Sequence, residues 1–182
     1  MPKRINDLLI GMTLNKLLVK ESAILGKNRV KVSMNRKMLE IMAKYQVTPM
    51  DLLEGRVSPS FRKYLRIAQD LRSQEYTYEW AMNDMAGFYG DDLPANENSD
   101  NRVYIEGDNN HDNLVLGYAL CRSIACSLVD RKDRFHVFMN FSDDGEYDCV
   151  KVSFYCRRQS YPDVLSSLET YVNEGIVLFD IL

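Results

Sequence analysis

The stretch FHVFMNFSDDGEYDCVKVSFYC, residues 135–156, decides the fold of the second half of this chain. Its two flanks alternate polar and apolar residues with a period of two, which is the pattern of half-buried β-strands. The turn formers at residues 142–145 lie between these flanks. The stretch therefore predicts a β-hairpin whose strands cover residues 135–141 and 149–156.

The segments around this hairpin alternate between strand and helix patterns. Residues 102–106 alternate as a strand, and residues 112–129 place apolar side chains at helical spacing. After the hairpin a helix begins at Pro162, and residues 176–181 form a last strand. The order β-α-β-β-α-β over residues 102–182 resembles the ferredoxin-like fold. That resemblance implies a four-stranded antiparallel sheet with both helices on one face.

The first half is predicted to be helical, with one short strand. Residues 29–34 alternate polar and apolar side chains and form the expected strand. Asn35 is a favourable N-cap for a helix over residues 36–45. Thr48 followed by Pro49 predicts the start of a second helix, because proline is favoured at the first helical position. The chain as a whole is therefore expected to be an α+β protein.

Charge and composition predict two domains. Residues 1–90 carry 15 Lys or Arg against 9 Asp or Glu, whereas residues 91–182 carry 8 against 17, so the net charges are +6 and −9. Helical patterns over residues 3–22 and 60–80 complete a basic helical domain over residues 1–90. Residues 91–101 are polar and rich in turn formers, and we predict them to be a linker. An acidic ferredoxin-like domain over residues 102–182 follows. An uneven charge distribution without functional meaning is the alternative interpretation.

Residues 28–53 combine one short strand with two helices that follow closely. This order resembles the ribbon-helix-helix family of DNA-binding dimers. The resemblance implies that the strands of two protomers pair and enter the major groove of duplex DNA. It also implies that Arg29, Lys31 and Ser33 contact bases, and that backbone N–H groups near Thr48 bind a phosphate. A strand that joins a neighbouring sheet is the alternative.

One face of the predicted second-half sheet is unusually aromatic. Period-two alternation assigns the other face to the helices. The aromatic side chains form a candidate partner or ligand face: Tyr104, His136, Phe138, Tyr155 and Phe179. The face could be covered by the N-terminal helices or a second protomer, could bind a ligand or a protein, or could stack the bases of single-stranded RNA. The net charge of −9 in this half disfavours RNA.

The motifs of catalysis and metal binding are missing from the sequence. The chain has no glycine-rich phosphate loop and no nucleophile elbow. Its four cysteines and two histidines are not at metal-ligand spacing. We therefore predict no catalytic residue, no cofactor and no metal site.

The location of the protein follows from its apolar segments and its cysteines. No apolar run reaches the roughly 20 residues that a membrane span needs. The first residues lack the apolar core of a secretory signal. The cysteines lie in apolar stretches, which favours buried, reduced thiols. We expect a cytoplasmic protein that does not bind membranes.

Two functions of different classes fit these features. The first is a DNA-binding regulatory protein, a homodimer whose acidic domain oligomerises or binds an effector. The second is a small inhibitor, such as a toxin-immunity protein or a phage-encoded antagonist, whose acidic half binds a basic partner protein. Duplex DNA and a protein are thus the two expected partners.

Overall fold

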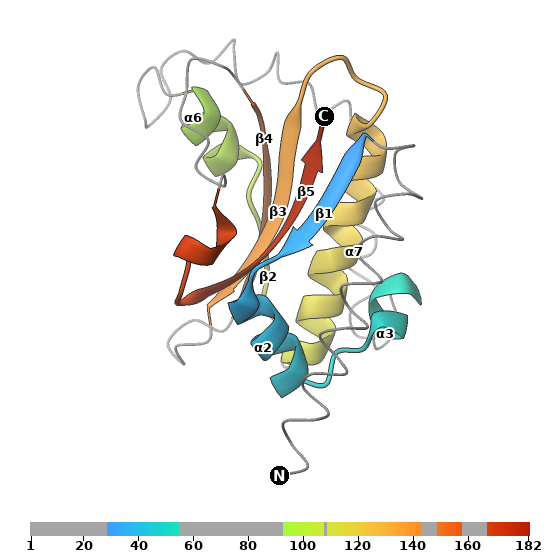
Figure 1. The fold of residues 1–182 in the computed structure, drawn as a ribbon, viewed down its shortest axis with the longest axis vertical. Helices are drawn as coiled ribbons and strands as arrows, with labels where there is room; N and C mark the ends of the chain where they lie inside the picture. The colour runs from blue at the N-terminus through green and yellow to red at the C-terminus, as the bar shows by residue number, and fades with distance from the viewer. Residues whose placement is uncertain (1–28, 55–92, 108, 143–148, 158–166) are drawn as a thin grey trace.

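The structure is a computed structural model that describes residues 29–54, 93–107, 109–142, 149–157 and 167–182 (Figure 1). Within these ranges the chain forms a five-stranded antiparallel sheet with helices on both faces. The predicted α+β class is confirmed. The helices predicted over residues 3–22 and 60–80 lie outside the described residues.

The elements follow one another in a mixed order along the chain. They are β1 (Val30–Met34), α2 (Arg36–Lys44), α3 (Pro49–Glu54), α6 (Leu93–Asp100), β2 (Val103–Ile105), α7 (Asn110–Leu128), β3 (Phe135–Ser142), β4 (Val150–Cys156), the short 3-10 helix η2 (Leu168–Thr170) and β5 (Glu174–Ile181). The strands are arranged β1-β5-β3-β4-β2, and each neighbouring pair is antiparallel. The pairing of β3 with β4 confirms the predicted hairpin.

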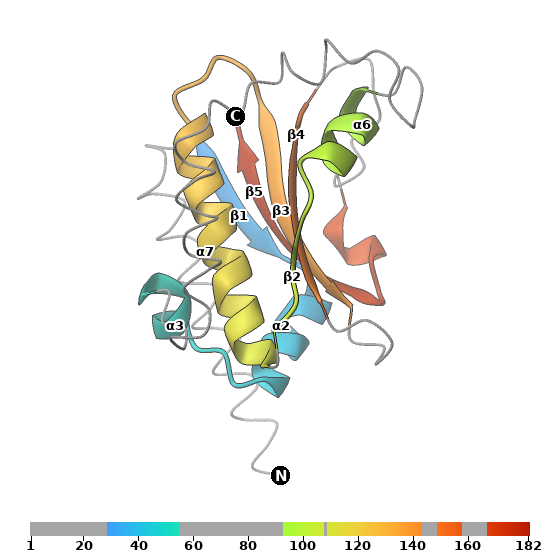
Figure 2. The same cartoon turned by 180° about the vertical axis from the view of Figure 1, so that it is seen from behind.

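The helices and turns lie in two layers around the sheet. α7 and α2 cover one face, which we call the α7 face, and α3 packs against α7 on the same side (Figures 1 and 2). α6 and η2 lie on the opposite face. The helix predicted from Pro162 begins outside the described residues, and its described part is only the single turn of η2. The expectation of both helices on one face is therefore not met, because η2 and α7 lie on opposite faces.

The strand order differs from that of the ferredoxin-like fold. In that fold the first strand of the domain occupies an inner position of the sheet. Here β2 is the outermost strand beside β4, and β3 takes the inner position between β4 and β5. The order of elements along the chain fits both arrangements, because in each the first and last connections skip one strand. The sequence pattern alone could not separate the two.

β1 comes from the basic half but pairs along its whole length with β5, from Val30 opposite Ile181 to Met34 opposite Val177. Sheet pairing between distant segments leaves no signal in the pattern of either strand, so it could not be expected from the sequence. The described residues of the basic and acidic halves therefore share one sheet and one core, where charge predicted two domains.

Residues 93–100 form α6, although their composition predicts a linker. α6 is tied to β4 by polar contacts. The buried carboxylate of Glu97 accepts the backbone N–H of Cys156 at 2.8 Å, and the hydroxyl of Ser153 donates to the carbonyl of Asn98 at 2.7 Å. The polar residues that suggested a solvated linker are thus partly used to dock this helix on the sheet.

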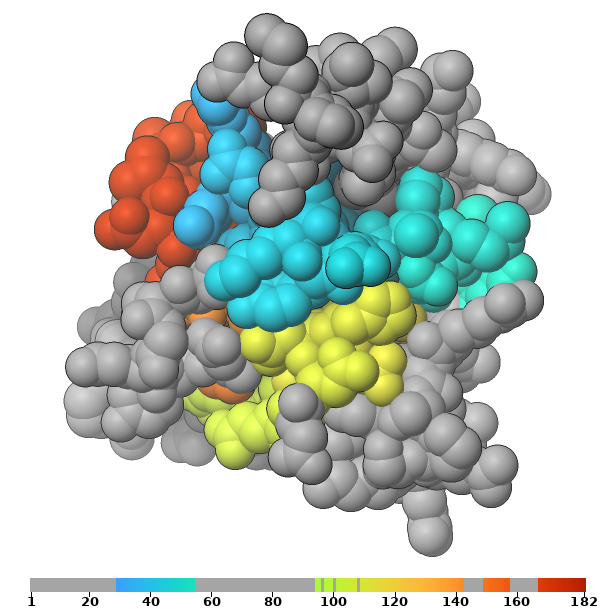
Figure 3. All heavy atoms as spheres, turned by 90° about the horizontal axis from the view of Figure 1, so that it is seen from below, coloured from blue at the N-terminus to red at the C-terminus, as the bar shows by residue number. Residues whose placement is uncertain are grey.

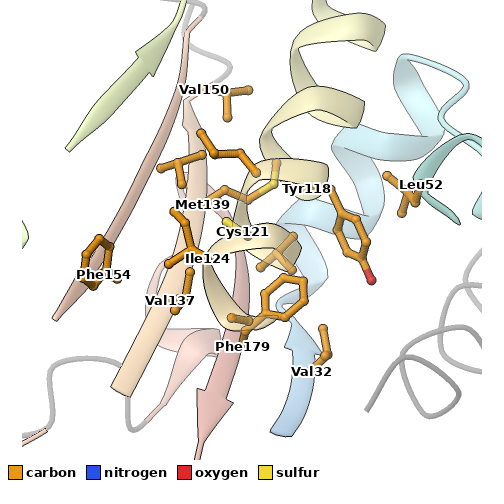
Figure 4. Close-up of a cluster of buried hydrophobic side chains, with 14 of the residues drawn as sticks. Val32, Leu52, Tyr118, Cys121, Ile124, Val137, Met139, Val150, Phe154 and Phe179 are labelled. Carbon is orange, nitrogen blue, oxygen red and sulfur yellow. The ribbon is translucent and has the colours of Figure 1, made fainter. Parts of the chain in front are cut away.

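The main hydrophobic core lies between the sheet and the helices of the α7 face (Figure 4). Val137 and Met139 of β3 are fully buried there, and the ring of Tyr118 on α7 lies 5.4 Å from that of Phe179 on β5. A Cβ atom on Gly117 would lie 2.5 Å from Cγ1 of Val150, closer than real contacts allow. Gly117 therefore lets α7 approach β4 closely.

Asn35 joins the start of α2 to the start of β5. It is the predicted N-cap, and its side chain accepts the N–H of Met38 at 3.0 Å. The same oxygen accepts the N–H of Ile176 at 2.9 Å. Its amide nitrogen donates to three backbone carbonyls, those of Leu168 at 3.3 Å, Tyr171 at 3.1 Å and Glu174 at 2.8 Å. One buried side chain thus satisfies backbone groups from two distant segments.

Candidate functional site

Two of the predicted DNA-contacting residues lie within β1, which is paired with β5 of the same chain. This pairing matches the alternative interpretation, a strand that joins a neighbouring sheet. Lys31 is exposed and Ser33 is half-buried, and both face away from the main core. Lys31 stands opposite Asp180 in the register of the two strands. A carboxylate beside Lys31 weakens the local attraction for phosphate.

Arg29 lies at the end of the sheet, just before β1. Its backbone carbonyl accepts the N–H of Leu182 at 2.8 Å, and its guanidinium donates to the carbonyl of Arg131 at 2.9 Å. Arg134 and Arg157 lie at the same end of the sheet, directly before β3 and directly after β4. The N–H of Arg157 donates to the carbonyl of Arg134 at 2.7 Å. We call Arg29, Arg134 and Arg157 the arginine row. It stands one residue beyond the ends of β1, β3 and β4.

Thr48 directly precedes α3. α2, α3 and the start of α7 meet at the other end of the molecule (Figure 3). The N–H of Thr48 donates to the carboxylate of Asp51 at 2.8 Å, and the N–H of Asp51 donates to the hydroxyl of Thr48 at 3.3 Å. This reciprocal cap already places a negative charge at the expected phosphate position. Asp51 contacts His111 at the first turn of α7, whereas Arg29 contacts Arg131 beyond its last turn. A helix of this length spans about 28 Å, so Thr48 and Arg29 are far apart.

The capping carboxylate of Asp51 is held in its charged form. Burial alone raises the pKa of Asp51, but the hydrogen bonds from Thr48 and the nearby His111 outweigh it, so this pKa lies below its usual value. A phosphate near Thr48 would meet this charge directly. The structure therefore argues against the phosphate role of Thr48.

Four of the five residues of the predicted partner face share one face of the sheet, the aromatic face: Tyr104, His136, Phe138 and Tyr155. Their exposure differs sharply. His136 and Tyr155 are 2% and 6% exposed, whereas Tyr104 is 45% exposed. The segment around η2 covers part of this face, because Leu168 and Tyr171 pack against the cluster of Tyr155, Ile176 and Leu178.

The fifth residue, Phe179, was predicted on the wrong face. It stands opposite Val137 and lies fully buried in the main core on the α7 face (Figure 4). Residues 176–179 are all apolar, so their pattern carries no alternation that identifies a face. Asp180 was the available signal. A carboxylate that faces away from the core puts Phe179, its neighbour along the strand, into it.

A chain of polar contacts crosses the aromatic face from Tyr155 to the arginine row. Nδ1 of His136 lies 2.9 Å from the hydroxyl of Tyr155, and its Nε2 lies 3.3 Å from Oδ1 of Asp180. The same oxygen of Asp180 lies 2.9 Å from the guanidinium of Arg157. Both nitrogens of the buried imidazole are thus engaged, and Arg157 is held by a carboxylate beneath it.

The acid titration of Asp180 gives a testable prediction. Burial raises the pKa of Asp180, but His136 and Arg157 outweigh it and hold this pKa below 3.8. A carboxyl group whose pKa is lower in the folded protein stabilises the fold at pH values above its pKa in the unfolded chain. This contribution is lost as the pH falls through its pKa in the folded protein. We expect Asp180→Asn to be destabilised at pH 7, and the difference from the wild type to shrink as the pH falls below 3.8.

Urea unfolding of both proteins at pH 7 and at low pH measures this difference. Asp130→Asn, in the exposed loop after α7, is the matched control and should leave stability nearly unchanged at each pH. An equal loss for Asp180→Asn at both pH values would show that packing, rather than charge, explains its effect.

The described residues hold no group of side chains suited to bind a metal ion, and the thiol of Cys121 is deeply buried. Within those ranges there is no cluster of three His, Cys, Asp or Glu side chains arranged to hold a metal ion. Cys121, Cys149 and Cys156 are buried and Cys126 is exposed, and none of the four forms a disulfide bond. Burial raises the pKa of Cys121 well above its usual value, which keeps that thiol protonated and unreactive. None of the helices in the described part of the chain is long and apolar enough to span a membrane.

Sequence reasoning singled out Arg29 but missed Arg134 and Arg157. A signal was present, because Arg29 and Arg134 directly precede predicted strands and Arg157 directly follows one. In an antiparallel hairpin the residue before the first strand and the residue after the second lie side by side. The position of Arg29 beside them depends on the pairing of β1 with β5, which the sequence did not reveal.

Comparisons with protein-family models, with curated proteins and with solved structures found no match to this chain. No family is therefore assigned to it. The function proposed below rests on geometry and charge.

Proposed function

We propose that the protein is a DNA-binding regulatory protein and that its arginine row meets the phosphate backbone of duplex DNA. The observation that supports this function is the gathering of Arg29, Arg134 and Arg157 at one end of the sheet from three separate parts of the chain. Guanidinium groups suit this role, because their planar donors match phosphate oxygens in pairs.

The spacing of the arginine row fits a polyanion. Neighbouring strands lie about 4.8 Å apart, so Arg29 and Arg157, three strand positions apart, are separated by about 14 Å. Duplex DNA carries one negative charge per about 1.7 Å of its axis, so a row of this length faces several phosphates.

The loop between α7 and β3 adds Arg131 and Lys132 to this end of the sheet. Together with the arginine row, and with Lys31 opposite Asp180, they give six positive charges among the described residues at this end, against three negative charges on Asp130, Asp133 and Asp180. The net charge of these described residues is thus +3, although the acidic half as a whole has a net charge of −9. We expect modest affinity at physiological salt and stronger binding at low salt.

The test is a double substitution, Arg29→Ala with Arg134→Ala. We expect the variant to fold like the wild type, because both residues are exposed. Its affinity for duplex DNA should fall, and the slope of log affinity against log salt should decrease by about 0.9 for each phosphate that the variant no longer binds. Fluorescence anisotropy with a labelled duplex at several salt concentrations measures both quantities.

Arg36→Ala with Lys37→Ala is the matched control, since it removes the same charge from α2 at the other end of the sheet. Equal weakening by the two double variants would show that total charge, and not the arginine row, governs binding. Size-exclusion chromatography with and without the duplex reports the oligomeric state. A monomer that binds no duplex at low salt would overturn the proposal and favour the inhibitor, which a pull-down for a basic partner protein would then test.

A further inference from the structure

Tyr104 is a second surface feature, apart from the arginine row, that is suited to binding a ligand. Among the residues that the structure describes, it is the only exposed aromatic side chain, at 45% exposure. It lies on β2, the outermost strand on its side of the described sheet. A water-exposed tyrosine ring on a short edge strand offers a flat apolar face that a planar ligand can reach.

Two cationic side chains flank this ring. Lys151 stands directly opposite Tyr104 in the register of β2 and β4, and directly opposed side chains on one face lie about 5 Å apart at Cβ. Arg102, two residues before Tyr104, donates from its guanidinium to the tyrosine hydroxyl at 3.2 Å. That hydrogen bond restrains the ring and leaves the other guanidinium donors available.

We propose that Tyr104, Arg102 and Lys151 form a binding site for single-stranded DNA. An unpaired base stacks on the ring of Tyr104, and the neighbouring phosphates bind Arg102 and Lys151. Stacking on an aromatic ring with cations along the backbone path is how proteins bind single strands without sequence preference. Duplex DNA cannot use this site, because its bases are stacked inside the helix.

The site is distinct from the arginine row. Arg157 follows Lys151 by six residues along β4, which corresponds to about 20 Å. The inference therefore goes beyond duplex binding and does not depend on it.

The local charge of the site differs from that of the acidic half, because Arg102 and Lys151 flank Tyr104 directly. Glu106, directly after β2, is the acidic residue nearest to Tyr104 in the sequence. Its charge opposes a phosphate on that side, so the bound strand should extend from Tyr104 towards Arg102.

The experiment measures binding of labelled twelve-nucleotide oligonucleotides to the full chain by fluorescence anisotropy at low salt. The probes are oligo-dT, an abasic strand of equal charge, and oligo-rU. We expect Tyr104→Ala to weaken oligo-dT binding roughly 5- to 150-fold, the range that loss of one stacked base gives. Tyr104→Phe keeps the ring and should stay close to the wild type. Met50→Ala removes another exposed apolar side chain, 55% exposed on α3, and should change nothing.

Stacking of a base on Tyr104 also predicts a difference in affinity between the abasic strand and oligo-dT. The abasic strand should bind the wild type more weakly than oligo-dT does, and Tyr104→Ala should not affect it. The proposal is overturned if the wild type does not bind oligo-dT, if it binds both strands equally, or if Tyr104→Ala binds oligo-dT as well as Tyr104→Phe does. Tighter binding of oligo-rU than of oligo-dT would overturn the assignment to DNA. Duplex binding is measured on the same variants, so failure of the arginine-row function is recognised separately.

Discussion

Replacing Phe179 with alanine is expected to lower the free energy of unfolding by about 3 to 5 kcal/mol, the usual loss for a buried phenylalanine. The ring of Phe179 is fully buried in the main core and contacts that of Tyr118 on α7. Its removal leaves a cavity between the sheet and α7, which the rigid strands on either side of β5 cannot fill. Urea unfolding followed by circular dichroism measures the loss.

Phe138→Ala is the matched control for this experiment. Phe138 stands one register position away on β3, next to β5, but it is only half-buried on the aromatic face. We expect it to cost clearly less than Phe179→Ala. A larger loss for Phe138→Ala would mean that the aromatic face holds the main core, and that the assignment of the two faces is inverted.

Asn35→Ala is expected to have the second largest effect, a loss of about 3 to 4 kcal/mol. The helix cap alone contributes about 1 kcal/mol. The change also leaves the N–H of Ile176 and the carbonyl of Glu174 without the partner that Asn35 supplies at 2.9 and 2.8 Å. A buried backbone group left unpaired costs about 1 to 3 kcal/mol, and the low end applies here because Glu174 is only half-buried; the cap and the two groups then add up to about 3 to 4 kcal/mol. Thermal and urea unfolding of the full chain measure the loss.

Asn109→Ala measures the loss of a helix cap alone, without the loss of contacts to a distant strand. Asn109 caps α7 by accepting the N–H of His111 at 3.0 Å, and it is exposed. Its replacement should cost only about 1 kcal/mol, the contribution of a cap. If the two variants lose the same stability, the contacts of Asn35 with the start of β5 contribute nothing.

Sequence patterns predicted those helices and strands whose formation depends on residues close together in the chain. The alternation of residues 135–156 predicted the hairpin of β3 and β4, and the apolar spacing of residues 112–129 predicted α7. Asn35 was recognised as a cap from its residue type and position. In each case the determining interactions lie within a few residues along the chain, so the sequence displays them directly.

Long-range features could not be predicted in this way. The pairing of β1 with β5 and the inner position of β3 depend on which strands meet, and a strand's pattern records only which of its faces is buried. α6 was missed because Glu97 and Asn98 bond to β4 rather than to water.

The candidate site was predicted only in part, for the same reason. Alternation correctly placed four residues on one face: Tyr104, His136, Phe138 and Tyr155. It could not assign the face of Phe179, because residues 176–179 of β5 are all apolar. The arginine row and the contact of His136 with Asp180 combine residues from distant strands.

The position of β5 between β1 and β3 also bears on how the chain folds as it is synthesised. Asn35 and its partner Ile176 are 141 residues apart. At about 5 to 20 residues per second, roughly 7 to 28 s pass on the ribosome between them. During that interval Val30 and Val32 lack the neighbouring strand that later completes their side of the sheet. The apolar face of β1 therefore stays without its partner strand, and open to chaperones, until almost the whole acidic half has emerged.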